Sequence, residues 1–299
     1  MATGGVSVVG DSGAWRAGAA VVATLTFDVD AETPVLAQGG RYARHLSTMS
    51  HQAYGPDVGV PRILELLDDL EVPATFFVPG WVAEQRPHLA PSIVERGHEV
   101  AHHSYSHRSA TDLSPSEQRD DFERGLEVFE RQGIEISGHR AALWQTTITT
   151  MELLAEHRLA YDSSMMADDR PYLLRLEDDD AVVELPVHWS LDDWEQYAFL
   201  PEPHVGSLIE APSKVLDLWG SELDAMRDHG CLFNLCLHPF LTGRPSRLAV
   251  VRRLVERARE HGDVSFERCR DVAARVADVG GVREVRVAET EIDPRTFPG

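Results

Sequence analysis

The stretch "AVVATLTFDVD" (residues 20–30) is an almost continuous apolar and β-branched run that ends in aspartates. A run of this kind is typical of a strand that is buried on both faces, as in a parallel sheet covered by helices. Further short runs of the same character follow along the chain. They cover residues 74–80, 98–104, 136–143, 159–165, 182–187 and 231–239. The sequence therefore predicts seven strands.

Stretches with apolar residues three and four positions apart separate these runs, as expected for crossover helices between parallel strands. The clearest are residues 60–70, 114–132 and 246–262. Ser114, followed by Pro115 and Glu117, supplies an N-cap, a first-turn proline and a capping-box acid. We therefore predict an α/β fold in which about seven parallel strands form a barrel.

The length of 299 residues suits one α/β barrel. We assign residues 19–279 to this domain, residues 1–18 to an N-terminal extension and residues 280–299 to a C-terminal tail. Residues 31–56 show no clear period. A long loop of this kind is usually a lid or a binding loop, and a disordered insertion is the alternative.

The formal net charge of -21 argues against nucleic acid as a partner, because phosphate backbones would be repelled. Three cysteines without a CxxC pair make a disulfide framework improbable. The apolar run 17–27 lacks the basic start of a signal peptide and the length of a membrane span. We therefore expect a cytoplasmic protein with no membrane partner.

Chemistry in α/β barrels is carried by residues at the carboxyl ends of the strands. Polar and aromatic side chains fall at or just after five of the predicted strand ends, so we expect them to meet on one rim. They are Asp28, Asp30, His103, His107, Arg140, Trp144, Asp192, Asp193, Trp194 and His238.

The motif "TFDVDAE" (26–32) places three acidic residues two positions apart. Side chains at this spacing on a strand project to the same side, so Asp28, Asp30 and Glu32 could present their carboxylates together. Such an arrangement costs electrostatic energy unless a cation lies among them. The alternative is that Asp30 and Glu32 simply begin an exposed loop.

The motif "HSYSH" (103–107) places two histidines where a strand end turns toward a helix, and His103 and His107 could both reach one ion. Chance histidine pairs are the alternative, and His98 and His102 are better explained as structural residues. One aspartate with two histidines forms a facial set with open positions, as in catalytic metal sites. Zinc suits this set, although iron, cobalt or nickel could occupy it.

His238 follows an apolar run and precedes a proline that ends the strand. It is either a buried histidine satisfied by a neighbour or, beside a metal site, a proton donor.

Taken together, the chain resembles the NodB-type polysaccharide deacetylases, carbohydrate esterase family 4 and its relatives, from about residue 21 to residue 276. The motifs that carry the resemblance are "TFDVDAE", "HSYSH", "RAALW", "ELPVHWSLDDW" and "LCLHP". The stretches "GVPRILELL", "ATFFVPG" and "RGHEVAHHSYSH" are most similar to a branch with cytoplasmic peptidoglycan-deacetylase-like proteins, cyclic imide hydrolases and ureide-ring hydrolases. The resemblance implies a distorted (β/α) barrel of the glycoside hydrolase/deacetylase type.

Residue by residue, the resemblance implies that Asp28 is the catalytic base and His238 the general acid. It implies that Asp30, His103 and His107 bind a divalent metal, most simply Zn²⁺. Arg140 matches the arginine that positions the base. Asp192 or Asp193 matches the acid that holds His238, and the sequence leaves open which of the two does so. Relatives in this branch often form multimers, so a homo-oligomer is expected.

The chain departs from the commoner family pattern at three positions. Val29 separates two aspartates that are usually adjacent, Ala142 replaces a proline, and Pro239 follows His238 where an aspartate is frequent. The aspartate spacing is shared with the cytoplasmic branch. It moves the expectation away from secreted chitin or xylan deacetylases and leaves the substrate open.

The resemblance implies a metal-dependent hydrolase of non-peptide carbon–nitrogen bonds that removes acetyl groups from an amino sugar. A cytoplasmic amidohydrolase of cyclic imides or ureides is the first alternative, and a non-catalytic carbohydrate-binding barrel is the second. Four aromatic residues could form a wall for a sugar ring or a planar imide, or could only pack against loops. They are Trp144, Trp194, Tyr105 and Trp81.

Overall fold

The computed structural model describes residues 13–176 and 181–288. Ten strands form one sheet among these residues, in the order β10-β1-β2-β3-β4-β5-β7-β6-β12, and β11 pairs separately with β1. The strands of this sheet are β1 (Val21–Asp28), β2 (Thr75–Val78), β3 (Glu99–His102), β4 (Gly138–His139), β5 (Tyr161–Asp162), β6 (Tyr172–Arg175), β7 (Ala181–Glu184), β10 (Leu232–Leu237), β11 (Val264–Phe266) and β12 (Glu284–Arg286).

The seven predicted strands are confirmed, and they are the consecutive parallel members of the sheet from β10 to β7. Every residue of β1 is buried, which explains its unbroken apolar run. An α/β fold with mostly parallel strands is therefore confirmed. β6 adds an antiparallel neighbour to β7, and β8 (Phe199–Leu200) pairs with β9 (Val205–Ser207) in a separate small sheet.

The curved sheet is distorted between its first and seventh parallel strands, β10 and β7. A side chain bridges them: Asn234 of β10 donates hydrogen bonds to the carbonyl oxygens of Leu185 (3.2 Å) and Pro186 (3.0 Å), just after β7. Further along the chain, Asp192 pairs with Cys236 of β10 in a single parallel β-bridge. Proline lacks a backbone N–H, so a regular ladder cannot continue through Pro186.

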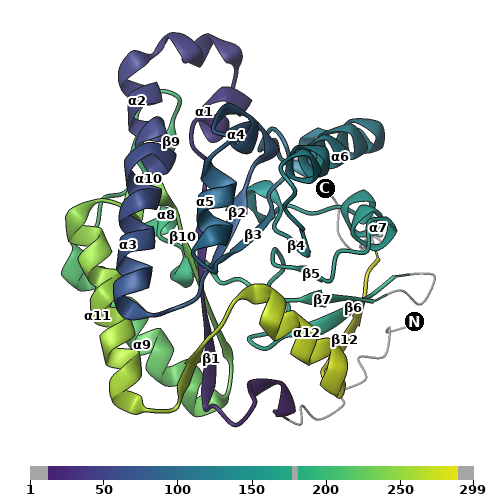
Figure 1. Ribbon diagram of the computed structural model, residues 1–299, viewed down its shortest axis with the longest axis vertical. Coiled ribbons are helices and arrows are strands. Elements are labelled where there is room, and N and C mark those ends of the chain that lie inside the picture. The colour runs from purple at the N-terminus through teal and green to yellow at the C-terminus, as the bar shows by residue number, and fades with distance from the viewer. Residues whose placement is uncertain (1–12, 177–180, 289–299) are drawn as a thin grey trace, which may run out of the picture.

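Helices surround the sheet, and α3, α9 and α11 lie along one flank of the molecule (Figure 1). The helices are α1 (Thr33–Ala37), α2 (Leu46–Tyr54), α3 (Val60–Leu70), α4 (Gly80–Gln85), α5 (Leu89–Glu95), α6 (Pro115–Arg131), α7 (Ile148–Glu156), α8 (Trp194–Tyr197), α9 (Pro212–His229), α10 (Pro239–Thr242), α11 (Pro245–His261) and α12 (Cys269–Val279). The three helices predicted at 60–70, 114–132 and 246–262 are confirmed as α3, α6 and α11. At the start of α6, Ser114 and Glu117 form the predicted capping box.

The expectation of a long loop over residues 31–56 is wrong. This segment contains α1, a 3₁₀-helix (Gly40–Arg44) and α2, and a π-helical turn (Gly55–Gly59) joins α2 to α3. Gln52 is the only buried residue of α2. A helix without a buried apolar stripe leaves no helical period in the sequence, so pattern reasoning could not find it.

Parts of the two segments that were predicted to be terminal extensions belong to the folded domain. Trp15 is fully buried in a cluster with Val272 and Val276 of α12, and β12 (Glu284–Arg286) pairs with β6. Residues 13–18 and 280–288 therefore belong to the folded body. A single apolar residue such as Trp15 creates no periodic pattern in the sequence, so periodicity could not predict its burial. The rest of both predicted extensions lies outside the described residues.

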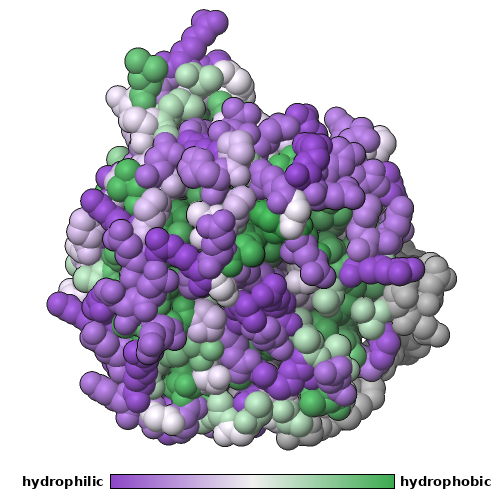
Figure 2. All heavy atoms as spheres, viewed as in Figure 1, coloured by the Kyte–Doolittle hydropathy of each residue, from purple (hydrophilic) through white to green (hydrophobic). Residues whose placement is uncertain are grey.

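Other expectations concern the surface and the cysteines. Cys231, Cys236 and Cys269 are all buried, and none of the three forms a disulfide. Within residues 13–176 and 181–288, no helix combines the length and apolarity that crossing a bilayer requires. Hydrophilic side chains cover most of the face shown in Figure 2, and apolar side chains are visible mainly in the hollows between them.

The turn that carries His238 is held by a close backbone contact. A Cβ atom added to Gly59 would overlap the carbonyl oxygen of Pro239, and one added to Gly243 would overlap Gly59. Backbone atoms on both sides cannot move aside cheaply. We expect Gly59→Ala to lower the free energy of unfolding by about 1–3 kcal/mol, the usual cost of overpacking a tight contact.

Urea denaturation of this variant and of Gly40→Ala provides the check. Gly40 also lies in a helical turn, but a Cβ there meets nothing within 4 Å. The control should stay within about 0.5 kcal/mol of the wild type. Equal unfolding midpoints for the two variants would show that the Gly59 contact is unimportant.

Candidate metal centre

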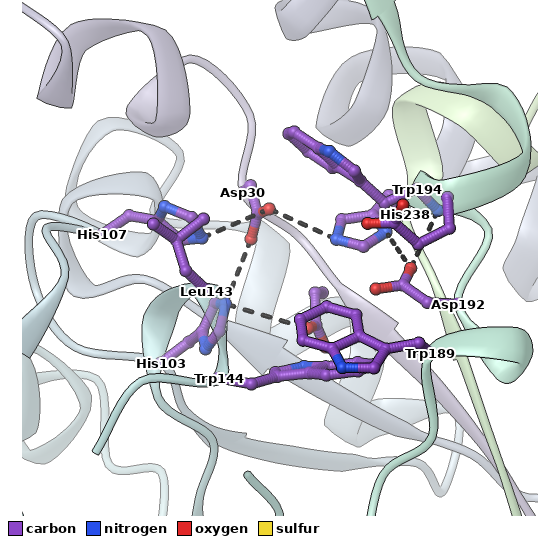
Figure 3. A pocket seen from close by; sticks show the side chains of 11 residues that line it. Asp30, His103, His107, Leu143, Trp144, Trp189, Asp192, Trp194 and His238 are labelled. Atoms are coloured by element: carbon purple, nitrogen blue, oxygen red, sulfur yellow. Dashed lines mark hydrogen bonds and ion pairs between the residues drawn. The ribbon is translucent and has the colours of Figure 1, made fainter. Parts of the chain in front are cut away.

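The carboxyl ends of the parallel strands gather the predicted side chains on one rim. Asp28 is the last residue of β1, His103 directly follows β3, and Arg140 directly follows β4. His238 directly follows β10. Figure 3 shows Asp30, His103 and His238 facing a common cavity. The strand register therefore brings together residues more than two hundred positions apart.

Asp30, His103 and His107 form the centre of the site. The Nε2 atoms of His103 and His107 each lie 3.3 Å from a different carboxylate oxygen of Asp30. The ligand atoms of the three residues all lie within 4.8 Å of one another, and all three side chains are buried. Asp30 Oδ1 is buried and accepts no hydrogen bond from the described residues.

These features fit a divalent cation. Two imidazole nitrogens and a carboxylate that converge in a buried position form a typical ligand set, and a cation would also compensate the buried Oδ1 of Asp30, which accepts no hydrogen bond from the described residues. Burial alone would raise the pKa of Asp30. The charge of His107 and the close contacts of the His103 and His107 imidazoles with the carboxylate outweigh burial and hold this pKa well below its usual range. Asp30 is therefore an ionised carboxylate.

A hydrogen bond on the side of the ring that faces away from the site fixes the orientation of His103. Its Nδ1 lies 2.6 Å from the carbonyl oxygen of Arg140, which can only accept a hydrogen bond. Nδ1 therefore carries the proton, and Nε2 presents its lone pair to the centre of the site. This arrangement is usual for histidines that bind metals.

The backbone around the cavity adopts left-handed conformations that non-glycine residues rarely take. The residues concerned are Ala31, Ser104, His107, Leu143 and Trp144, with φ between 52° and 60°. Each such residue costs about 1–3 kcal/mol, and such residues concentrate at functional sites. For His107, the hydroxyl oxygen of Ser104 accepts the backbone N–H at 3.0 Å and supports the turn. These turns aim the ligands, and nothing in the local sequence predicts them.

Asp28 lies on one side of this centre and is held by Arg140. The guanidinium Nη1 donates to Asp28 Oδ1 at 2.8 Å, and the arginine is fully buried. Further hydrogen bonds run from Arg140 to Thr26 (2.9 Å) and to the carbonyl oxygen of Ser163 (3.0 Å). Burial opposes the charge on Arg140, but the neighbouring Asp28 carboxylate outweighs it and raises the arginine's pKa. The pair is therefore a fixed ion pair.

His238 also lies beside this centre, with its Nε2 3.5 Å from Asp30 Oδ2. Its Nδ1 lies 2.7 Å from Asp193 Oδ1 but 3.6 Å from Asp192 Oδ1. Asp193 also accepts the backbone N–H of His238 (2.9 Å) and the hydroxyl of Thr242. Of the two aspartates that the sequence left open, Asp193 is thus placed to hold the histidine.

Burial would lower the pKa of His238, but the hydrogen bond to Asp193 and the charges of Asp192 and Asp193 raise it to about 10. The imidazole is therefore charged near neutral pH. In this state its Nε2–H points toward the centre of the site and can be donated.

A cavity of about 180 Å³ opens above these groups. Trp144 and Trp189 pack against each other at its edge, with ring centroids 4.6 Å apart. The Trp194 ring contacts the His238 ring edge-on, with the two ring centroids 5.1 Å apart. The lining residues are Asp28, Asp30, His103, His107, Leu143, Trp144, Trp189, Asp192, Trp194, Glu195 and His238.

Three expectations about the cavity need correction. Tyr105 does not line it: its hydroxyl donates to Glu84 at 2.6 Å. Trp81 packs against the main hydrophobic core instead. Glu32 does not join the carboxylates of Asp28 and Asp30, because it forms an ion pair with Arg86 at 2.7 Å. The positive φ of Ala31 turns the chain between Asp30 and Glu32, so the strand alternation that predicted a shared side ends there.

Three residues that line the cavity were not predicted from the sequence, namely Leu143, Trp189 and Glu195. Trp189 and Glu195 lie within or directly after the motif "ELPVHWSLDDW", so proximity to Asp193 was an available signal. Leu143 is 51% exposed and has no such signal. His102, predicted to be structural, faces away from the cavity, and its Nε2 lies 3.1 Å from the carbonyl oxygen of Phe122.

The fold and the site together define a class of protein: a mostly parallel α/β fold whose strand ends carry a candidate Asp-His-His metal site beside a carboxylate and a charged histidine. A family model described as polysaccharide deacetylase matches residues 53–147. A solved structure from Mycobacterium smegmatis, assigned to the polysaccharide deacetylases, is 42% identical. It covers 92% of this chain and 96% of its own, with a TM-score of 0.88.

The chain belongs to the polysaccharide deacetylase family. The peptidoglycan deacetylase of Helicobacter pylori is 26% identical over 252 residues, which are 75% of this chain and 86% of that protein. A solved allantoinase shares the fold at 20% identity, with a TM-score of 0.78 over 92% of this chain and 97% of its own. The predicted family and the predicted enzyme class, a hydrolase of non-peptide carbon–nitrogen bonds, are confirmed.

Proposed function

We propose that the protein is a metal-dependent N-deacetylase that removes the acetyl group from an N-acetylated amino sugar. The observation that carries this proposal is that a carboxylate and a histidine both lie beside the Asp30, His103 and His107 cluster. Asp28 Oδ2 is 3.9 Å from His103 Nε2, and His238 Nε2 is 3.5 Å from Asp30 Oδ2. An amide needs a base on the side of attack and an acid on the side of departure. The names of the relatives agree with an amino-sugar substrate.

Asp30, His103 and His107 would hold the metal, and we propose zinc because two imidazoles and one carboxylate suit it. A bound divalent cation lowers the pKa of water and polarises an amide carbonyl. Asp28 accepts a proton from the attacking water, while the ion pair with Arg140 keeps its carboxylate in place.

His238 supplies the proton that the leaving nitrogen requires, because an amide nitrogen departs poorly as an anion. Its Nδ1–H stays on Asp193, and its Nε2–H faces the reacting groups. The aromatic edge formed by Trp144 and Trp189 offers an apolar surface to one face of a sugar ring. All the groups that hydrolysis requires are thus present, which argues against a barrel that only binds carbohydrate.

A second candidate is an amidohydrolase of cyclic imides or ureides. The cavity of about 180 Å³ with its aromatic edge would accept a small planar ring, and the fold is shared with an allantoinase. A cytoplasmic location, which we propose from the sequence, would favour such a substrate because cell-wall polymer is not reachable there. A homo-oligomeric state is likewise proposed from the family resemblance.

Zinc-loaded protein assayed on a substrate panel separates the two candidates. We expect acetate release from N-acetylated chitooligosaccharides, loss of this activity with a chelator, and recovery when zinc is added back. Ring opening of succinimide or dihydrouracil without acetate release would replace the first candidate by the second. Protein that retains stoichiometric zinc and hydrolyses none of these compounds would contradict both.

A further inference from the structure

Two neighbouring aspartates meet His238, but their hydrogen bonds differ. Asp193 is saturated: one oxygen accepts from the backbone and the ring of His238, and the other accepts from Thr242. Asp192 accepts one hydrogen bond, from the backbone N–H of Trp194 to its Oδ1 at 2.8 Å. Its Oδ2 accepts none from the described residues. Asp192 lines the cavity, whereas Asp193 does not.

The other charges of the cavity are compensated. Asp28 is paired with Arg140, and Asp30 lies among imidazoles and would bind the cation. The charge of His238 is matched by Asp193. Asp192 and the exposed Glu195 therefore remain as negative groups without a strong partner, and no lysine or arginine is among the described residues that line the cavity.

Burial raises the pKa of Asp192 to about 7, with a further contribution from Asp193 and opposition from His238. A carboxyl group in this position is costly to keep unless a ligand completes its hydrogen bonds. The remaining oxygen, Oδ2, points toward the cavity in Figure 3, while Oδ1 lies 3.6 Å from His238 Nδ1.

We propose that Asp192 is a specificity-determining residue, which accepts a hydrogen bond from a donor group of the substrate beside the scissile nitrogen. The site consequently takes cationic or neutral amides and rejects molecules that carry a carboxylate in this region. This inference rests on the proposed function for the choice of amino sugars as ligands. It adds a charge preference that hydrolysis alone does not require.

Binding of three sugars with the same ring and different charge tests the proposal without turnover. Glucosamine is cationic, glucose neutral and glucuronate anionic, and none has an amide to hydrolyse. Titration of zinc-loaded protein at pH 7, where the glucosamine amine is mostly protonated, followed by calorimetry or by tryptophan fluorescence, should rank glucosamine first and glucuronate last. Acetate release by the same preparation reports separately on the proposed function.

The variant Asp192→Asn should reverse this preference. Its amide oxygen can replace Oδ1 for the N–H of Trp194, so an N–H donor would replace the acceptor that faces the cavity. We expect the affinity ratio of glucosamine to glucuronate to fall by about tenfold or more, as for loss of one charge-assisted hydrogen bond.

The matched control is Asp228→Asn, which removes the same charge from an exposed side chain at the C-terminal end of α9. It should leave the ratio unchanged. An unchanged ratio in Asp192→Asn, tight binding of glucuronate by the wild type, or binding of none of the three sugars would each overturn the proposal. If the ratio shifts as expected but the wild type releases no acetate, the charge preference stands and the proposed deacetylation fails.

Discussion

Replacing Asp30 by asparagine is expected to abolish metal binding and to lower kcat/KM by about 10³-fold or more. The carboxylate contacts both histidines of the cluster at 3.3 Å and is the only anionic member of the ligand set. A bound cation contributes several kcal/mol to amide hydrolysis, and each 1.36 kcal/mol corresponds to a factor of ten in rate. Emission spectroscopy after dialysis, together with acetate-release kinetics, measures both effects.

The matched control for this experiment is Glu32→Gln. It lies two residues along the chain and removes the same charge, but its carboxylate pairs with Arg86 outside the cavity. We expect it to keep the metal and most of the activity. Stoichiometric metal in Asp30→Asn, or equal metal loss in the two variants, would show that the proposed ligand set is wrong.

The second large effect is expected for His238→Ala, which should lower kcat by about 10²-fold or more while the metal is retained. The histidine is charged near neutral pH and contributes no ligand to the proposed set. Its loss removes the proton donor for the leaving nitrogen. Steady-state kinetics with parallel metal analysis provides the measurement.

A suitable control is His98→Asn. His98 is also buried, but it directly precedes β3, whereas His103 directly follows the other end of that strand. This variant reports on the general cost of replacing a buried histidine and should keep kcat within about threefold, since the change does not touch the reacting groups. A near-native rate in His238→Ala would remove His238 from the proposed role of acid.

The sequence was sufficient for the strands because burial on both faces demands unbroken apolar runs, and these are visible in the one-dimensional pattern. It was insufficient for α1, which is only five residues long and too short to show a helical period, and for α2, which buries a single side chain. The same limit applied to Trp15, whose burial against α12 depends on chain segments more than two hundred residues apart.

At the site, the positions of Asp30, His103 and His107 after their strands were sufficient to predict that the three residues meet on one rim. Parallel strands end at the same edge of a sheet. Their binding of a metal stays a prediction. The sequence could not choose between Asp192 and Asp193, since adjacent side chains differ only in the direction that the local backbone gives them. The bridge between Asp192 and Cys236 sets that direction.

The sequence by itself determined the parallel α/β architecture, the family and the strand ends from which the polar residues project. These depend on periodicity and on motif order, which are properties of the chain. Only the tertiary structure decided that Glu32, Tyr105 and Trp81 lie away from the cavity, that Trp189 and Glu195 border it, and that Asp193 holds His238. These depend on left-handed turns and on pairings between distant segments, for which a linear pattern carries no signal.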